Sequence, residues 1–96
     1  MPLLHRKPAP VPLAFSPLVD TRSLARYQAG GHEYEAMVQH LLRIHGGSAG
    51  WIWSVLVDGK RPGFPHSGRV RTQAGAQRAA GTAIAGDVAR QAASRP

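Results

Sequence analysis

The stretch that decides the fold is Trp51-Ile52-Trp53-Ser54-Val55-Leu56-Val57-Asp58-Gly59. Its side chains alternate between two faces, and aromatic and β-branched residues of this kind are typical of a half-buried strand. Asp58-Gly59 then supplies the residues of a type I′ turn. The stretch therefore predicts a strand over residues 51–58 whose end leads into a hairpin turn.

After this turn the chain is expected to return as a strand over residues 61–71. Pro62 and Pro65 interrupt it, and proline cannot donate a hydrogen bond to a neighbouring strand. We therefore expect an edge strand or a looped excursion, of which Gly68–Arg71 is the most strand-like part.

A helix is predicted over residues 73–93, because small apolar residues recur there at spacings of three and four. Thr72 is a plausible N-cap for this helix. Gly75, Gly81 and Gly86 each weaken a helix by up to about 1 kcal/mol relative to alanine. Packing against a sheet must therefore hold the helix in place.

Residues 33–44 fit two patterns. At helical spacing Tyr34, Val38 and Leu41 share an apolar stripe, whereas at a spacing of two Tyr34, Val38 and Leu42 share one face of a strand. The residue types favour a helix, but a sheet of only two strands is marginal. We therefore predict a strand here.

The expected fold class is α+β, with an antiparallel sheet of about three strands (33–44, 51–58 and 61–71) packed by the C-terminal helix (73–93). If residues 33–45 instead form a helix, the order becomes α-β-β-α. Residues 1–25 contain five of the eight prolines, which favours a flexible, proline-rich N-terminal arm. Residues 26–96 then form a single small domain.

The chain is strongly basic, with a formal net charge of +7 over 96 residues. Ten of its twelve cationic residues are arginines, whose planar guanidinium group suits phosphate and carboxylate partners. A charge of this size attracts polyanions, although it also serves solubility. We find no apolar run that would form a transmembrane helix or a secretory signal, so a cytoplasmic location is expected.

Residue types that carry catalysis or bind metals are scarce. There is no cysteine and there are five acidic residues. Glu33 and Glu35 are most simply two solvated carboxylates, and the spacing of His32, His40 and His45 matches no known zinc site. The glycine-rich segment 46–50 lacks the ending of a phosphate-binding P-loop. We therefore expect no enzymatic activity, no catalytic or metal-binding residue and no cofactor.

Basic residues gather around the predicted hairpin, and we predict that four of them bind nucleic acid: Lys60, Arg61, Arg69 and Arg71. Sheet-based nucleic-acid binders use arginines for phosphates or base edges and aromatic residues for stacking. Trp51 and Trp53 lie on one face of the predicted strand. They either stack on bases or, more simply, pack under the C-terminal helix.

The run Trp51-x-Trp53-x-Val55-x-x-Asp58-Gly59-Lys60-Arg61, followed by Gly68, Thr72 and an alanine-rich helix, resembles small uncharacterised proteobacterial proteins with a strand–hairpin–strand–helix layout. More loosely, residues 33–93 are similar to DNA-binding domains of the AP2 type and of the arm-binding regions of phage integrases. This resemblance implies a bacterial protein whose Arg69 and Arg71 face a DNA groove.

Two functions are consistent with these patterns. The first is a small basic module that binds DNA or RNA. The alternative is a non-enzymatic interaction or adaptor domain that binds an acidic protein through a sheet edge or through the proline-rich arm.

Overall fold

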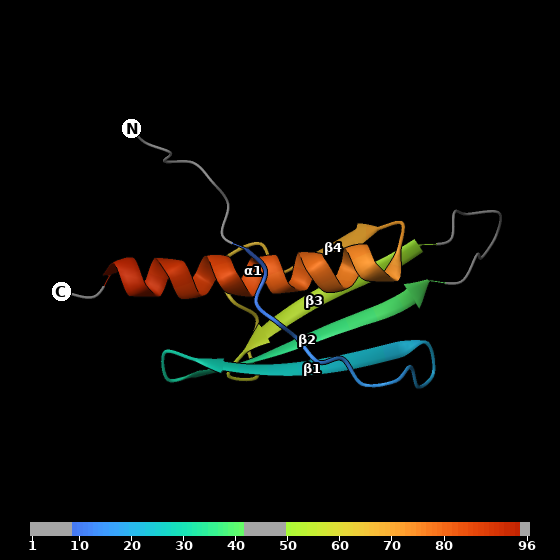
Figure 1. The fold of residues 1–96 in the computed structure, drawn as a ribbon, viewed down its shortest axis with the longest axis horizontal. Coiled ribbons are helices and arrows are strands. Elements are labelled where there is room, and N and C mark those ends of the chain that lie inside the picture. Colours follow the sequence, from blue (N-terminus) through green and yellow to red (C-terminus); the bar gives the residue numbers. More distant parts are fainter. Residues whose placement is uncertain (1–8, 42–49, 95–96) are drawn as a thin grey trace.

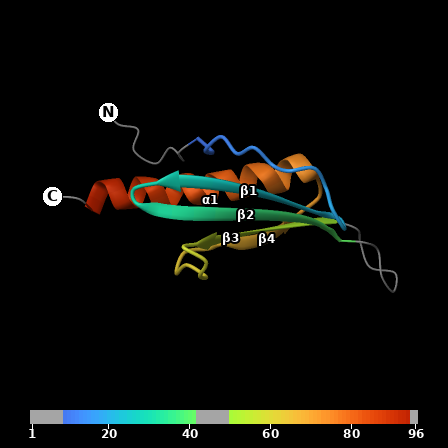
Figure 2. The ribbon, with the colours of Figure 1, turned by 90° about the horizontal axis from the view of Figure 1, so that it is seen from below.

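The computed structural model describes residues 9–41 and 50–94, which form a four-stranded antiparallel sheet and one long helix (Figure 1). The strands are β1 (Arg22–Ala29), β2 (His32–Leu41), β3 (Gly50–Val57) and β4 (Ser67–Val70), and the helix is α1 (Gln73–Ser94). Neighbours in the sheet follow the chain in the order β1-β2-β3-β4, with α1 on one side (Figure 2).

The predicted α+β class is confirmed, but the sheet has four strands rather than about three. The strand missing from the prediction is β1, which pairs with β2 along its full length. Its buried side chains, Ser23 and Ala25, are small or polar. Hydrophobic alternation therefore does not reveal this strand.

The segment that fitted two patterns is a strand, so the α-β-β-α alternative is wrong. Tyr34, Ala36 and Val38 are fully buried at a spacing of two. β2 pairs with β1 on one side and β3 on the other, so neighbouring strands meet its backbone groups along both edges. This pairing outweighs local helix propensity. Residues 42–44 of the predicted strand lie outside the described residues.

Tight turns with positive φ follow β1 and β3. Gly30 and Gly31, at φ 59° and 81°, join β1 to β2. Asp58 and Gly59, at 53° and 78°, reverse the chain after β3, as the type I′ prediction requires. Val57 and Lys60 exchange backbone hydrogen bonds of 2.9 and 3.0 Å across this second turn.

The return strand after this turn is shorter than predicted. Residues 61–66 form a loop containing Pro62 and Pro65, and β4 begins only at Ser67. Two prolines without backbone donors explain why pairing with β3 starts beyond them.

Helix α1 lies close to the sheet because the contacting side chains are small. Its buried residues are Ala76, Ala80, Gly81, Ile84 and Ala85. Thr72 caps the helix as predicted, since its Oγ1 accepts a 3.0 Å hydrogen bond from the N–H of Gly75.

Residues 9–21 pack on the same side of the sheet as α1 (Figures 1 and 2). Val11, Leu13 and Phe15 contact the core, and the Val11 N–H donates to the carbonyl oxygen of Gly81 at 3.2 Å. Part of the predicted arm therefore lies against the domain, and the predicted boundary at residue 25 falls inside β1. Residues 1–8 of that arm lie outside the described residues.

Candidate nucleic-acid interface

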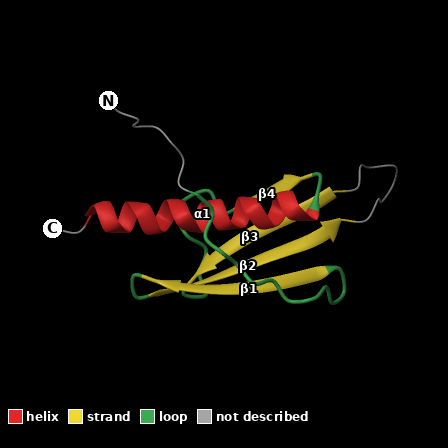
Figure 3. Ribbon diagram, in the orientation of Figure 1, coloured by secondary structure: helices red, strands yellow, loops and turns green. Residues whose placement is uncertain are grey.

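One face of the sheet packs against α1, and the other carries no helix or strand within residues 9–41 and 50–94 (Figure 3). We call this second face the open face. Buried Ser23, Ala25 and Val55 lie on the α1 side, so their alternating neighbours project the other way. The open face consists of Arg22, Leu24, Arg26, Gln28, Glu33, Glu35, Met37, Gln39, Leu41, Ile52, Ser54, Leu56, Ser67 and Arg69.

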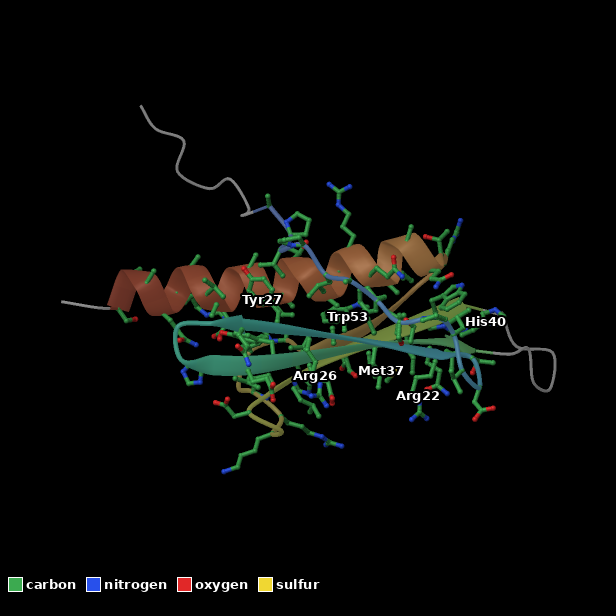
Figure 4. All side chains as sticks on the ribbon, turned by 60° about the horizontal axis from the view of Figure 1, so that its bottom comes forward. Arg22, Arg26, Tyr27, Met37, His40 and Trp53 are labelled. Carbon is green, nitrogen blue, oxygen red and sulfur yellow. The ribbon has the colours of Figure 1, made fainter. Side chains whose placement is uncertain are left out.

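Side chains of the open face form rows across the strands. One row runs Arg22–Gln39–Ile52–Arg69, the next Leu24–Met37–Ser54–Ser67, and the third Arg26–Glu35–Leu56. Figure 4 shows Arg22, Arg26 and Met37 projecting from the side of the sheet away from α1. The arginines thus lie on the two edge strands, and aliphatic and uncharged polar residues occupy most of the centre.

The open face has an excess of positive charge. Arg22 and Arg26 extend from β1 and Arg69 from β4, and all three residues are exposed. The Arg69 side chain lies beside Gly50, where an added Cβ would meet its Nε at 3.2 Å. Arg26 and Glu35 form an ion pair of 3.9 Å, too long and exposed to fix either side chain.

The four predicted nucleic-acid-binding residues do not form one cluster. Lys60 forms a bridge with Val57 at one end of β3, whereas Arg69 pairs with Ile52 near the other end. Five residues of β3 separate these positions, which corresponds to about 17 Å. Arg71 directly follows β4.

Lys60 and Arg61 nevertheless belong to a loop that leaves β3 on the side of the sheet away from α1 (Figure 2, yellow). Both residues are exposed. The structure therefore places this pair beside one end of the open face.

Arg22 and Arg26 were missed by the sequence prediction because β1 itself was missed. Their signal is the alternation Arg22-Ser23-Leu24-Ala25-Arg26, which sends the arginines to one face and the small residues to the other. Reading the small residues as buried, rather than requiring large apolar ones, would have identified the strand and its arginines.

The tryptophans face α1 and not the open face. Trp53 packs against the core, in agreement with the simpler of the two interpretations. Trp51 stacks on His40, with ring centroids 4.7 Å apart and an interplanar angle of 32°. Neither indole group is therefore available for base stacking on the open face.

A buried polar cluster fastens α1 to β2. The Tyr34 hydroxyl donates a 2.6 Å hydrogen bond to Asp87, and Gln91 donates to the same carboxylate at 2.7 Å. Burial, followed by the hydrogen bond to Asp87, raises the pKa of Tyr34 well above its usual value. Tyr34 therefore stays protonated, and the cluster is a structural anchor.

Asp58 links the two turns at one end of the sheet. Its Oδ1 accepts a 2.9 Å hydrogen bond from the N–H of Glu33, and its Oδ2 lies 2.6 Å from His32 Nδ1. The backbone hydrogen bond from Glu33, followed by the contact with His32, lowers the pKa of Asp58.

A groove of about 870 Å³ lies on the α1 side of the sheet. Small residues of α1, the aromatic rings of Trp53 and Phe64, and Ala9 and Pro10 line much of it. Arg90 lies over the Phe64 ring, with its guanidinium carbon 5.0 Å from the centroid. Because α1 and the sheet separate them, the groove and the open face are distinct surfaces.

Across residues 9–41 and 50–94, no three His, Asp or Glu side chains come together as a metal site. In the same part of the chain, no helix is both long and apolar enough to cross a bilayer. Comparisons with protein families, with curated proteins and with solved structures found no match to this chain.

Proposed function

We propose that this chain is a small nucleic-acid-binding module that uses the open face of its sheet. The observation that carries the proposal is the arginine pair Arg22 and Arg26 on one edge strand, with Arg69 on the opposite edge. Guanidinium groups bind phosphate oxygens through two parallel hydrogen bonds. The module binds without catalysing a reaction.

The charge of the open face also favours a polyanion over a second copy of the chain as its partner. Two open faces packed together would bring six arginines into one interface against four glutamates, which leaves an excess of two positive charges. Like charges in a contact of this kind are repulsive. A phosphate backbone neutralises them instead and releases its own counterions.

The proposal is tested by the salt dependence of binding. The purified full chain is titrated into fluorescent DNA and RNA oligonucleotides between about 50 and 200 mM salt, and binding is measured by anisotropy. Replacing Arg22 with Gln removes one phosphate contact, so we expect the slope of log K against log salt to fall by about one.

Arg78→Gln is the matched control, because Arg78 is an exposed arginine on α1. This variant loses the same charge and is expected to keep the parental slope. Equal effects of Arg22→Gln and Arg78→Gln would show that net charge, and not the open face, is responsible. A lack of binding to every oligonucleotide at low salt would reject the proposal.

A protein partner is the second candidate, and the aliphatic centre of the open face favours it. Leu24 is 43% exposed among Met37, Ile52 and Leu56, an arrangement that resembles the core of a protein interface. An acidic partner would also satisfy the arginines at the edges. Nuclease-resistant co-purification of one acidic protein, lost in Leu24→Ser, would favour this function over nucleic-acid binding.

A further inference from the structure

The distribution of aromatic residues bears on which nucleic acid the open face would accept. Tyr34 and Trp53 face α1, and so do Tyr27 and Trp51, whereas the open face carries no aromatic side chain within the described strands. Proteins that hold single strands depend on aromatic rings on which the bases stack. The open face therefore lacks the groups that would bind unpaired bases.

The spacing of the strands sets the distance between the arginines on the two edges of the open face, and this distance can be compared with the width of a nucleic-acid groove. Arg22 and Arg69 end the same row, three strand spacings apart, which corresponds to about 14 Å between their Cα atoms. The major groove of B-form DNA is about 12 Å wide and admits two paired β-strands. In A-form RNA the major groove is too deep and narrow for side chains to read.

We infer that the open face binds the major groove of double-stranded DNA, with β2 and β3 over the base edges and the arginines of β1 and β4 on the phosphates of the two strands. This inference rests on the proposed function. Lys60 and Arg61, at one end of the open face, contact the backbone beyond the groove.

The centre of the arginine row is the position that meets the bases. Gln39 and Ile52 lie there, between Arg22 and Arg69. A glutamine carboxamide can donate to and accept from the major-groove edge of adenine, and an aliphatic side chain packs on the thymine methyl group. At this position the open face therefore prefers an A·T pair, and Gln39 is the residue that sets this preference.

The first experiment compares three labelled ligands of one sequence with the full chain: double-stranded DNA, single-stranded DNA and double-stranded RNA. We expect double-stranded DNA to bind at least about tenfold more tightly than the other two at about 150 mM salt, where weak charge attraction is screened. Equal or tighter binding of single strands or of double-stranded RNA would overturn the inference while leaving the proposed function intact. No binding to any of the three would reject both.

The second experiment selects binding sites from a randomised DNA duplex pool. We expect A·T pairs to be enriched, and Gln39→Ala to reduce that enrichment about tenfold. Gln77→Ala is the matched control, because it removes the same amide group from α1, on the other side of the sheet, and is expected to leave the selected sequences unchanged. An unchanged preference in Gln39→Ala, with the fold verified by circular dichroism, would overturn the assignment of this residue.

Discussion

At the scale of single residues, the turn before β1 holds two residues in an unfavourable conformation. Asp20 and Thr21 have φ values of 52° and 66°, although neither is glycine. Val19 and Arg22 exchange backbone hydrogen bonds across them, and the Thr21 carbonyl accepts from the N–H of His40 at 2.9 Å. These bonds hold Thr21 where a β-branched side chain is strained.

Thr21→Gly is therefore expected to stabilise the chain. Relief of the positive φ is worth about 1–2 kcal/mol, and the added freedom of glycine in the unfolded state removes part of that gain. We expect the free energy of unfolding, measured by urea denaturation, to rise by about 0.5–1 kcal/mol. Thr21→Val keeps the branching but lacks the hydroxyl, so it should not be stabilised. A glycine variant no more stable than the parent would show that the turn carries no strain.

At the scale of elements, the crossing of residues 9–21 over α1 depends on one glycine. A Cβ at Gly81 would lie 3.0 Å from the carbonyl oxygen of Val11 and 3.1 Å from Pro10 Cβ. On the same helix, a Cβ at Gly86 would make only an ordinary van der Waals contact, 3.6 Å from Arg90 Nη1.

These two glycines should respond differently to alanine. Gly86→Ala is expected to stabilise the chain by about 0.5–1 kcal/mol, because alanine is the better helix former. Gly81→Ala gains the same propensity but pushes Pro10 and Val11 away from the helix. We therefore expect faster hydrogen exchange at the Val11 N–H in Gly81→Ala and not in Gly86→Ala. Equal exchange rates in the two variants would contradict the close crossing.

Elements with strong local signals were predictable from the sequence. The strand at 51–57, the Asp58-Gly59 turn and the helix after Thr72 each combine a clear periodicity with turn or capping residues. β1 was not predictable in this way because its buried side chains are small, and the decision for residues 33–41 depends on pairing with strands on both sides.

The candidate site was predictable only in part for the same reason. Arg69 and Arg71 belong to the predicted hairpin, whereas Arg22 and Arg26 become neighbours of the site only once β1 joins the sheet. The register between two strands brings together residues that are distant in the chain. That register cannot be predicted from the sequence pattern of either strand alone.

At the scale of the whole molecule, the free energy of unfolding should depend on pH through Asp58, which connects the turns at one end of the sheet. Its pKa is lowered in the folded state, so its carboxylate stabilises the fold above the ordinary aspartate pKa of about 3.9. That stabilisation is lost as the pH falls through the lower folded value.

Asp58→Asn tests this dependence, since asparagine tolerates the positive φ and can still accept the hydrogen bond from Glu33. We expect the variant to be less stable than the parent near neutral pH, with the difference narrowing as urea titrations approach about pH 2. Glu35→Gln removes one carboxylate from the open face and controls for net charge. A difference between Asp58→Asn and the parent that stays constant with pH would contradict the role of the charge.

The segment that precedes β1 also affects how the folded chain meets other folded chains. Every open sheet has two edges whose backbone groups can recruit a foreign strand and begin aggregation. Here the Ser16 N–H donates to the Leu24 carbonyl at 2.9 Å, and Pro17 follows with no donor of its own. The chain thus covers part of the β1 edge with a piece of itself that cannot extend the sheet regularly. Removing residues 9–19 would uncover that edge and, with it, a template for intermolecular β-structure.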